Sequence, residues 1–212
     1  EARDPKPSTA RPDRFLQSAP DINMRVMNCT TAAQYFHLLR RQAALLRRDP
    51  LPLVVLTPKS LLRHPLVAST PMGLVEGRFR SVIDDHDARQ RASSIRRLVL
   101  CSGKVYVDLV SSERRQSSTN VAICRVEQLA PFPRVALREV LDTYPSLEEV
   151  VWLQEEPENM GSWDWVRGQL EELLQERLSL RYIGRMRNAS PSEGSAAWHQ
   201  INQRKLVDEA FT

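Results

Sequence analysis

The first regular pattern along the chain is a short apolar run followed by a helical repeat and a second apolar run. Residues 24–29 form the first run, and Thr31 with Gln34 three residues later has the arrangement of a helix-capping box. The side chains that then recur at helical spacing are Tyr35, Leu38, Leu39, Gln42 and Leu46. Residues 51–57 are a continuous apolar and β-branched run bounded by prolines, which is typical of a strand covered on both faces. The pattern over residues 24–57 therefore predicts a strand, a helix and a second strand.

Proline and charge interrupt the chain before and after this unit. The first twenty residues are rich in both, and their "RFLQ" predicts a short helix after a loop. Residues 58–95 contain Pro58, Pro65 and Pro71 and end in a charged stretch, so at most one short strand is expected there, around residues 79–83. This segment is interpreted as an interdomain connection.

A second alternation of strands and helices runs to the end of the chain. Strands are predicted at 97–101, 120–126, 149–154 and 180–184, and helices at 104–116, after the "PFP" at 131–133, after Ser162, and at 196–211. The apolar faces expected on the second and third of these helices are Leu137, Val140, Leu141 and Tyr144, and Trp163, Val166, Leu170, Leu173 and Leu174. Strands that alternate with helices predict an α/β fold with a mostly parallel, doubly wound sheet.

The stretch "LQEEPENMGSWDWV" at 153–166 fits an acid/base site, an acidic docking surface or a strand-to-helix corner. Pro157 is expected to stop the strand, and Ser162 with Asp164 to start the next helix. Adjacent residues on a strand point in opposite directions, so Glu155 and Glu156 are expected to have structural or interface roles rather than one shared catalytic role. The tryptophans, Trp152, Trp163, Trp165 and Trp198, are interpreted as core and interface anchors.

The carboxyl ends of the predicted strands are where an open α/β sheet builds its sites. This edge would gather Ser102–Gly103–Lys104, Glu127–Gln128 and Gln154–Glu155–Glu156. Ser102, Gly103 and Lys104 lie at a strand-to-helix turn, where their amides and the lysine could hold an anion. The alternative is that Ser102 is only a helix N-cap.

The histidines and cysteines show no spacing typical of a metal site or a nucleophile motif. His37 lies beside the apolar stripe of its helix and is interpreted as packing. His64 follows a strand end in a loop and is the one weak catalytic candidate. Cys29, Cys101 and Cys124 lie at or within apolar runs and are expected to be buried, reduced thiols. No metal site is predicted.

Composition narrows the classes of function. The 212 residues carry a net charge of +4, but the arginines are scattered among the acids, so a nucleic-acid-binding domain, kept open as a rival, lacks the basic stripe it would need. The seven glycines form no phosphate-binding motif, so no cofactor is expected on this chain alone. Since no apolar run is long enough to cross a membrane and no secretory signal is found, an intracellular protein without membrane contact is expected.

Joined in order, these segments resemble one known family. From about Ser8 onward, the chain closely resembles the C-terminal part of the thiamine-diphosphate-dependent 2-oxoglutarate dehydrogenase component. The segments that carry the resemblance are "NCTTAAQYFHLLRRQ", "PLVVLTPKSLLRHPL", "VLCSGKVYVDL", "VAICRVEQLAPFP", "VVWLQEEPENMGSWDWV", "LRYIGR" and "ASPSEGSAAWHQ".

The resemblance implies a division of the chain and a parent enzyme. Residues 1–62 would be the last β-α-β part of a pyrimidine-binding domain, 63–95 the connection, and 96–212 a transketolase-type C-terminal domain. The whole enzyme of this family is a homodimer of the citric acid cycle that decarboxylates 2-oxoglutarate on thiamine diphosphate with Mg²⁺. It passes the succinyl group to the lipoyl groups of the dihydrolipoyl succinyltransferase core. The resemblance also implies a bacterial cytoplasm or, in a eukaryote, the mitochondrial matrix.

For this chain, the resemblance implies a structural, dimer-forming portion without catalysis of its own, because the thiamine-binding parts lie upstream, and it adds a regulatory role as a further option. The position of a family active-site histidine is Pro7, which removes a proton-handling side chain. Acetyl-CoA or AMP regulates some members near the domain junction, where Arg40, Lys59 and Arg63 are candidates to meet phosphates. The alternative function is a stand-alone nucleotide-binding regulatory module that uses these residues or Ser102 to Lys104.

Overall fold

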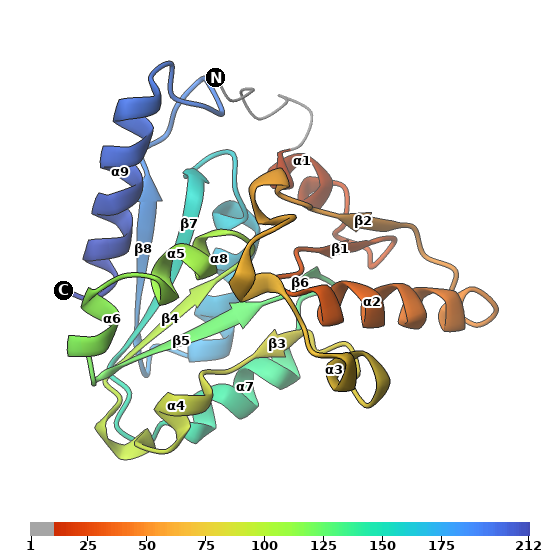
Figure 1. The fold of residues 1–212 in the computed structure, drawn as a ribbon, viewed down its shortest axis with the longest axis horizontal. Coiled ribbons are helices and arrows are strands. Elements are labelled where there is room, and N and C mark those ends of the chain that lie inside the picture. Colours follow the sequence, from red (N-terminus) through yellow and green to blue (C-terminus); the bar gives the residue numbers. More distant parts are fainter. Residues whose placement is uncertain (1–10) are drawn as a thin grey trace.

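The larger of two β-sheets occupies the C-terminal half of the chain. A computed structural model describes residues 11–212, and Figure 1 shows the two sheets side by side. The larger sheet has the strand order β3 (Val82–Ile83), β5 (Val121–Val126), β4 (Arg97–Cys101), β7 (Glu149–Pro157) and β8 (Ser179–Arg185). Its last four members are parallel, and β3 pairs antiparallel with β5 at the edge. The prediction of a mostly parallel α/β sheet is confirmed.

Helices cover both faces of the larger sheet, so it is doubly wound as predicted. Alternate residues of β4 point to opposite sides, with Leu98 and Leu100 in one apolar cluster and Val99 and Cys101 in the other. The helices α7 (Arg134–Thr143) and α8 (Trp163–Leu174) pack on the first side, and α5 (Val105–Val110) and α9 (Ala196–Glu209) on the second. The five residues predicted for the apolar face of α8 are all buried.

The smaller sheet joins the N-terminal unit to the C-terminal half. Its strands are β2 (Leu53–Val55) and β1 (Arg25–Met27), which are parallel, and β6 (Gln128–Ala130), which is antiparallel to β1. Only Glu127 separates β5 from β6, so one continuous segment of chain contributes to both sheets. The helix α2 (Ala32–Leu45) begins as predicted, because Thr31 Oγ1 accepts a hydrogen bond from Gln34 N at 3.2 Å.

Two expectations for this N-terminal unit are wrong. The strand expected to be covered on both faces spans only Leu53–Val55, and all three of its residues are half-buried. Within the apolar stripe expected on α2, Leu38 is buried, but Tyr35, Leu39 and Leu46 are exposed. The buried side of α2 is instead made by Gln34, His37 and Leu38, because hydrogen bonds from two polar side chains fix that side to the rest of the chain.

The remaining segments are short helices and turns. The predicted "RFLQ" helix is α1 (Pro12–Gln17), and the expected short strand near residue 80 is β3. Residues 58–95 also contain η1 (Lys59–Leu61), η2 (Pro65–Val67), α3 (Pro71–Val75), α4 (His86–Arg89) and η3 (Ala92–Ser94). The single helix expected at 104–116 is two, α5 and α6 (Arg114–Ser117), because the chain turns at Ser111–Glu113. Among residues 11–212, no helix is long and apolar enough to span a membrane.

Candidate functional site

The strand order places the candidate edge at a switch in winding direction. From β4 the chain passes to β5 on one side and then to β7 on the other, so β4 and β7 are neighbours although β5 separates them in sequence. In open α/β sheets, ligands bind in the crevice outside the carboxyl ends of such strands. The residues at this point are those that the sequence analysis selected, Ser102–Lys104 after β4 and Gln154–Glu156 in β7.

Lys104 lies among acidic side chains at this edge. Its Nζ is 2.5 Å from Asp108 Oδ2 and 3.6 Å from Glu155 Oε2. Ser102 Oγ donates to Val126 O at 2.8 Å rather than capping α5, whose side-chain cap hydrogen bond is absent. The lysine charge is therefore balanced within the chain, and an anion here would compete with two carboxylates.

Gly103 serves close packing at the same turn. Its φ of +71° lies in the left-handed region, and a Cβ there would be 2.3 Å from Asn28 Nδ2. Asn28 follows β1, and its backbone N–H donates to Glu127 O at 2.8 Å. The turns after β1, β4 and β5 thus meet at one place, which joins the two sheets.

A buried carboxylate lies at this joint between the sheets. Glu127 is 0% exposed and accepts hydrogen bonds from the backbone N–H of Thr30 at 2.9 Å and from the Thr30 hydroxyl. Gln34 Nε2 donates to it at 3.5 Å. Burial raises the pKa of Glu127, and the hydrogen bonds from Thr30 act against that shift. The carboxylate therefore fixes the β1–α2 turn to the end of β5.

Arg125, Cys29 and Cys101 lie near enough to Glu127 to interact with its charge. Arg125 Nη1 donates to Thr30 Oγ1 at 2.9 Å, and its guanidinium lies 4.3 Å from the centroid of the Tyr106 ring. Cys101 and Cys124 are buried free thiols, as predicted. Cys29 is also a free thiol, but it is only half-buried, so the expectation of burial is wrong for it. Burial raises the pKa of Cys101 to about 12, so this thiol is not a ready nucleophile near neutral pH.

The stretch at 153–166 is a strand-to-helix corner organised by Gln154. Its Oε1 accepts from Trp152 Nε1 at 3.1 Å and from the backbone N–H groups of Ser162 and Trp163 at 3.0 and 2.9 Å. Gln154 therefore supplies the cap that was expected from Ser162 itself. Gly161 is required beside it, since a Cβ there would lie 2.1 Å from Gln154 Nε2.

The tryptophans divide between core and surface. Trp152 and Trp163 are buried as expected, and the Trp163 ring lies 5.1 Å from that of Tyr182. Trp165 is partly buried and donates from Nε1 to Leu129 O at 2.9 Å. Trp198 is 62% exposed, so it is not a core anchor within this chain, and its role as an interface anchor stays a prediction.

The acids of the corner contact their own domain. Besides Lys104, Glu155 Oε2 lies 3.4 Å from Gln203 Nε2 of α9, and Glu155 O accepts from Arg185 Nη1. Arg185 also pairs with Glu193 at 3.2 Å and reaches His199 Nδ1 at 3.3 Å. This network fastens α9 to the carboxyl ends of β7 and β8.

The remaining predicted site residues are spread over the N-terminal unit. Arg40 contacts its own helix, with Nη1 3.3 Å from His37 Nδ1. Lys59 and Arg63 are exposed around η1, and His64 is the N-cap of η2, where Nδ1 accepts from Leu66 N at 3.3 Å. Pro7 lies outside the described residues.

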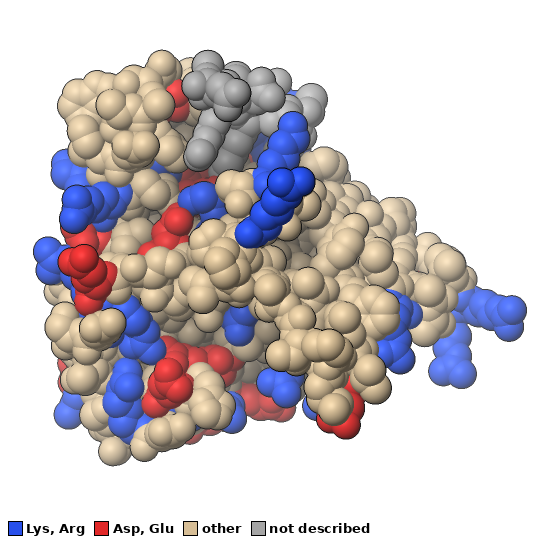
Figure 2. Space-filling model, viewed as in Figure 1, with Lys and Arg blue, Asp and Glu red and all other residues tan. Residues whose placement is uncertain are grey.

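His37 has the packing role expected for it. Its Nε2 lies 2.8 Å from Gly73 O, which joins α2 to α3. On the face shown in Figure 2, basic and acidic side chains are interspersed over the larger sheet, and basic side chains project from the far end of α2.

Two protein-family models match the chain. The model described as 2-oxoglutarate dehydrogenase C-terminal matches residues 68–211, and the model described as transketolase, pyrimidine binding domain, matches residues 3–65. The first match covers every strand of the larger sheet, and the second covers β1, α2 and β2.

Curated relatives of the chain come from bacteria. It is 43% identical over 215 residues to a 2-oxoglutarate dehydrogenase E1 component of Shouchella clausii (strain KSM-K16), covering 100% of this chain and 23% of that protein. The proteins of the same name from Geobacillus sp. (strain WCH70) and Geobacillus kaustophilus (strain HTA426) are 42% and 43% identical, covering 100% of this chain and 22% of each relative. The chain thus spans under a quarter of the length of the curated relatives it matches.

Proposed function

The chain belongs to the 2-oxoglutarate dehydrogenase C-terminal family, and we propose that it acts as the C-terminal portion of an enzyme that oxidatively decarboxylates 2-oxoglutarate. In this proposal, the larger sheet is a folded scaffold, and the N-terminal unit is the place where the preceding part of the enzyme attaches. The chain alone is expected to be catalytically inactive.

The main support for this proposal is that the smaller sheet and α2 are only partly buried within this chain. Parallel strands are normally buried on both faces, yet β2 is half-exposed along its whole length and pairs only with β1 among the described residues. On the outer side of α2, Tyr35, Leu39 and Leu46 are 42%, 45% and 59% exposed. Exposed apolar groups on one helix face are typical of a surface that another segment covers.

The cofactors belong to the preceding part of the enzyme in this proposal. Among residues 11–212, no group of three or more His, Cys, Asp or Glu side chains could hold a metal ion, and the sequence has no glycine-rich phosphate loop. We therefore assign no ligand of thiamine diphosphate or Mg²⁺ to this chain. The 23% coverage of the Shouchella relative leaves ample sequence for those ligands upstream.

The partners and location follow from the same proposal. The whole enzyme would be a homodimer that delivers succinyl groups to the lipoyl arms of a dihydrolipoyl succinyltransferase core. Because the relatives named above are bacterial, the bacterial cytoplasm is the proposed compartment.

The first test is the intact mass of the natural gene product, with an assay of 2-oxoglutarate decarboxylation in thiamine diphosphate and Mg²⁺. We expect a product well above 24.3 kDa that is active. A natural product of 24.3 kDa without activity would overturn the proposal and favour the regulatory module.

The second test asks whether α2 is the attachment surface. The upstream part is produced separately and mixed with this chain, and the recovered activity is measured. Leu39→Asp should abolish recovery because it places a charge on the apolar side of α2. Met186→Asp is the matched control, since Met186 is 87% exposed and follows β8 on the larger sheet. Equal recovery with both variants would remove α2 as the attachment site.

A further inference from the structure

The outer strand of the larger sheet, β8, is long and has an open edge. Figure 1 shows β8 at one side of the sheet next to α9, and among residues 11–212 it pairs only with β7. It spans Ser179–Arg185 and contains no proline. The strand at the opposite edge, β3, is only Val82–Ile83. Because short or interrupted edge strands protect a sheet from pairing with other chains, β8 is the less protected edge.

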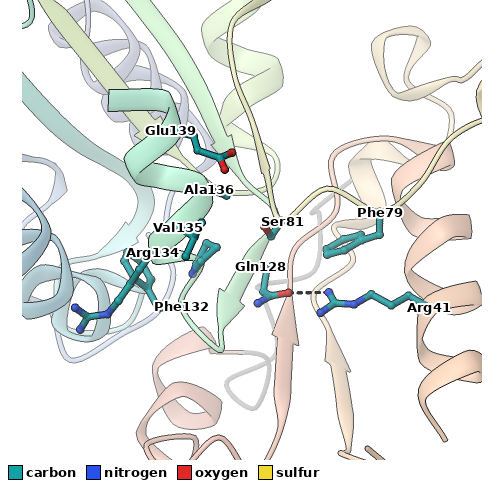
Figure 3. A pocket seen from close by; sticks show the side chains of 10 residues that line it. Arg41, Phe79, Ser81, Gln128, Phe132, Arg134, Val135, Ala136 and Glu139 are labelled. Atoms are coloured by element: carbon teal, nitrogen blue, oxygen red, sulfur yellow. Dashed lines mark hydrogen bonds between the residues drawn. The ribbon is translucent and has the colours of Figure 1, made fainter. Parts of the chain in front are cut away.

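The edge at β3 also adjoins other parts of this chain. The backbone N–H of Gln128 donates to Ser81 O at 3.1 Å, which fixes the segment before β3 to β6 of the smaller sheet. Figure 3 shows Ser81 beside Gln128 at this place. Within residues 11–212, no segment is hydrogen-bonded in this way to the outer side of β8.

The backbone groups on the outer side of β8 are therefore unpaired in the described part of the chain. The N–H of Ser179 donates to Glu148 O at 3.3 Å, so the odd-numbered residues of β8 face β7. Successive residues of a strand direct these groups to opposite sides, so those of Leu180, Tyr182 and Gly184 point away from the sheet. They offer donors and acceptors to another extended strand.

Charged side chains of β8 do not protect this edge. Arg181 and Arg185 lie on the same face of the sheet as Ile183, which is the face that α9 covers. Arg181 Nε is 3.1 Å from Glu149 Oε1, and Arg185 Nε is 3.2 Å from Glu193 Oε1. Since acids of this chain already balance both arginines, their repulsion of a second basic strand is weak.

The helix α9 runs antiparallel to β8. In its first turn, His199 Nδ1 lies 3.3 Å from Arg185 Nη2. In its last turn, Glu209 Oε1 lies 3.9 Å from Arg181 Nη1. A helix rises about 1.5 Å and a strand about 3.3 Å per residue, so Tyr182, in the middle of β8, is level with residues 205–209 of α9.

The side of α9 toward the open edge carries charges of both signs. Gln203 Nε2 donates to Asp108 Oδ2 of α5 at 2.8 Å, so Gln203 marks the side of α9 toward the middle of the sheet. Lys205 lies about 200° further round the helix and therefore on the outer side. It is exposed and forms no ion pair among residues 11–212. Glu209 follows one turn later on that side and is also exposed.

We propose that β8 pairs antiparallel with β8 of a second copy of this chain, about a two-fold axis at Tyr182. The unpaired groups of Leu180 would then meet those of Gly184 in the second copy, and Tyr182 would meet its own counterpart. Lys205 of each copy would lie opposite Glu209 of the other. This match of the surface with itself favours a second copy over an unrelated peptide as the occupant.

The side chains of β8 fit the same arrangement. Leu180 and Tyr182 lie on one face of the sheet, where the Tyr182 ring is 5.1 Å from that of Trp163. A Cβ on Gly184 would lie 2.0 Å from Tyr182 Oη, so the tyrosine of each copy covers its own glycine. Leu180 of the second copy would pack against this ring, and such cross-strand pairs stabilise antiparallel strands.

This inference goes beyond the homodimer proposed for the whole enzyme, because it locates one contact on the larger sheet and requires no catalytic activity. The test is sedimentation of the full chain at concentrations from about 1 to about 100 µM. We expect a reversible dimer with twice the mass of the 24.3 kDa chain. A chain that stays monomeric over this range would overturn the proposal.

A proline on the open edge tests the backbone pairing. Leu180→Pro removes an N–H that points away from the sheet, and proline is accepted at such edge positions, so the chain should remain folded by circular dichroism. The matched control, Leu180→Ala, also loses the leucine side chain but keeps the N–H. Leu180→Pro should weaken the dimer at least about tenfold more than Leu180→Ala. Equal dimerisation of the two variants would contradict pairing through this edge.

Charge reversal on α9 tests the arrangement independently of the fold of β8. Lys205→Glu should weaken the dimer, and adding Glu209→Lys to it should restore the dimer. Arg204→Glu, at the exposed preceding residue, should have no effect, because it lies about 100° away round the helix. Failure of the double variant to recover, or loss of the dimer in Leu39→Asp on α2, would place the contact elsewhere and overturn the proposal.

Discussion

The two sheets differ in how completely this chain covers them. In the larger sheet, β4 and β7 are buried on both faces between α7 and α8 on one side and α5 and α9 on the other. In the smaller sheet, β1 is buried, but β2 is half-exposed and α2 turns apolar side chains outward. The C-terminal half thus buries its core within this chain, whereas the N-terminal unit leaves apolar side chains exposed.

We expect the larger sheet to determine the stability of the chain and the exposed side of α2 to serve association. A core closed within the chain supplies free energy of folding directly, since burial of apolar area is the main favourable contribution. An apolar surface left open contributes little to the chain alone and acts when a partner covers it. Substitutions in the two halves should therefore differ in kind, which the following predictions use.

The largest expected effect is in the closed half. Trp163→Ala should lower the free energy of unfolding by about 3–5 kcal/mol, because the ring is buried and packs on Tyr182. Trp198→Ala is the matched control, since that side chain is 62% exposed, and should change stability by less than about 0.5 kcal/mol. Denaturant unfolding followed by circular dichroism measures both. Similar effects in the two variants would remove the distinction between core and surface tryptophans.

The second-largest change in stability is expected at the joint between the sheets, where the turns after β1, β4 and β5 meet. Gly103→Ala should destabilise the chain by about 1–3 kcal/mol, because the residue has φ of +71° and its new Cβ would overlap Asn28. Gly168→Ala, within α8, is the control, since a Cβ there meets nothing within 4 Å. It should stabilise by about 0.5–1 kcal/mol. The same unfolding experiment applies, and a neutral Gly103→Ala would show that the turn relaxes freely.

Glu127 gives the joint a dependence on pH. Because burial raises its pKa, the folded chain holds this proton more tightly than the unfolded chain. The stability from this group is therefore present below the unfolded pKa and lost as pH rises through the folded pKa. The free energy of unfolding of the wild type minus that of Glu127→Gln should fall as pH rises from about 4 toward 7.

Unfolding at a series of pH values measures this difference. The exposed Glu148 supplies a control, Glu148→Gln, for which no such fall is expected. A flat or rising difference for Glu127→Gln would show that the hydrogen bonds from Thr30 outweigh burial.

The closed half is the part of the fold that the sequence predicts well. Apolar runs at 97–101 and 149–154 and the five-residue face of α8 are local patterns whose burial is completed within the chain. The resemblance also selects the correct family. The 104–116 segment is wrongly predicted as one helix, since the chain turns at Ser111–Glu113 and α6 begins only at Arg114.

The open half and the site residues were harder to predict. On α2, polar Gln34 and His37 face inward through hydrogen bonds to Arg80 O and Gly73 O, distant in sequence. The same holds for Gln154, which caps α8 across seven intervening residues, and for Arg41, whose hydrogen bond goes to Gln128, distant in sequence (Figure 3). Such roles depend on contacts between segments, and local spacing carries no signal for them.

The smallest expected effect tests the open half directly. Leu39→Asp should change the free energy of unfolding of this chain by less than about 0.5 kcal/mol, because Leu39 is 45% exposed and lies on the uncovered side of α2. Leu38→Asp, at the buried neighbour on the same helix, should destabilise strongly because it buries a charge. Denaturant unfolding of the two variants measures the contrast.

The same measurement decides how the activity-recovery experiment is interpreted. If Leu39→Asp unfolds the chain, a loss of recovered activity with the upstream part would reflect misfolding and not a disrupted attachment surface. A stable Leu39→Asp chain that fails to restore activity would instead assign the outer side of α2 to association.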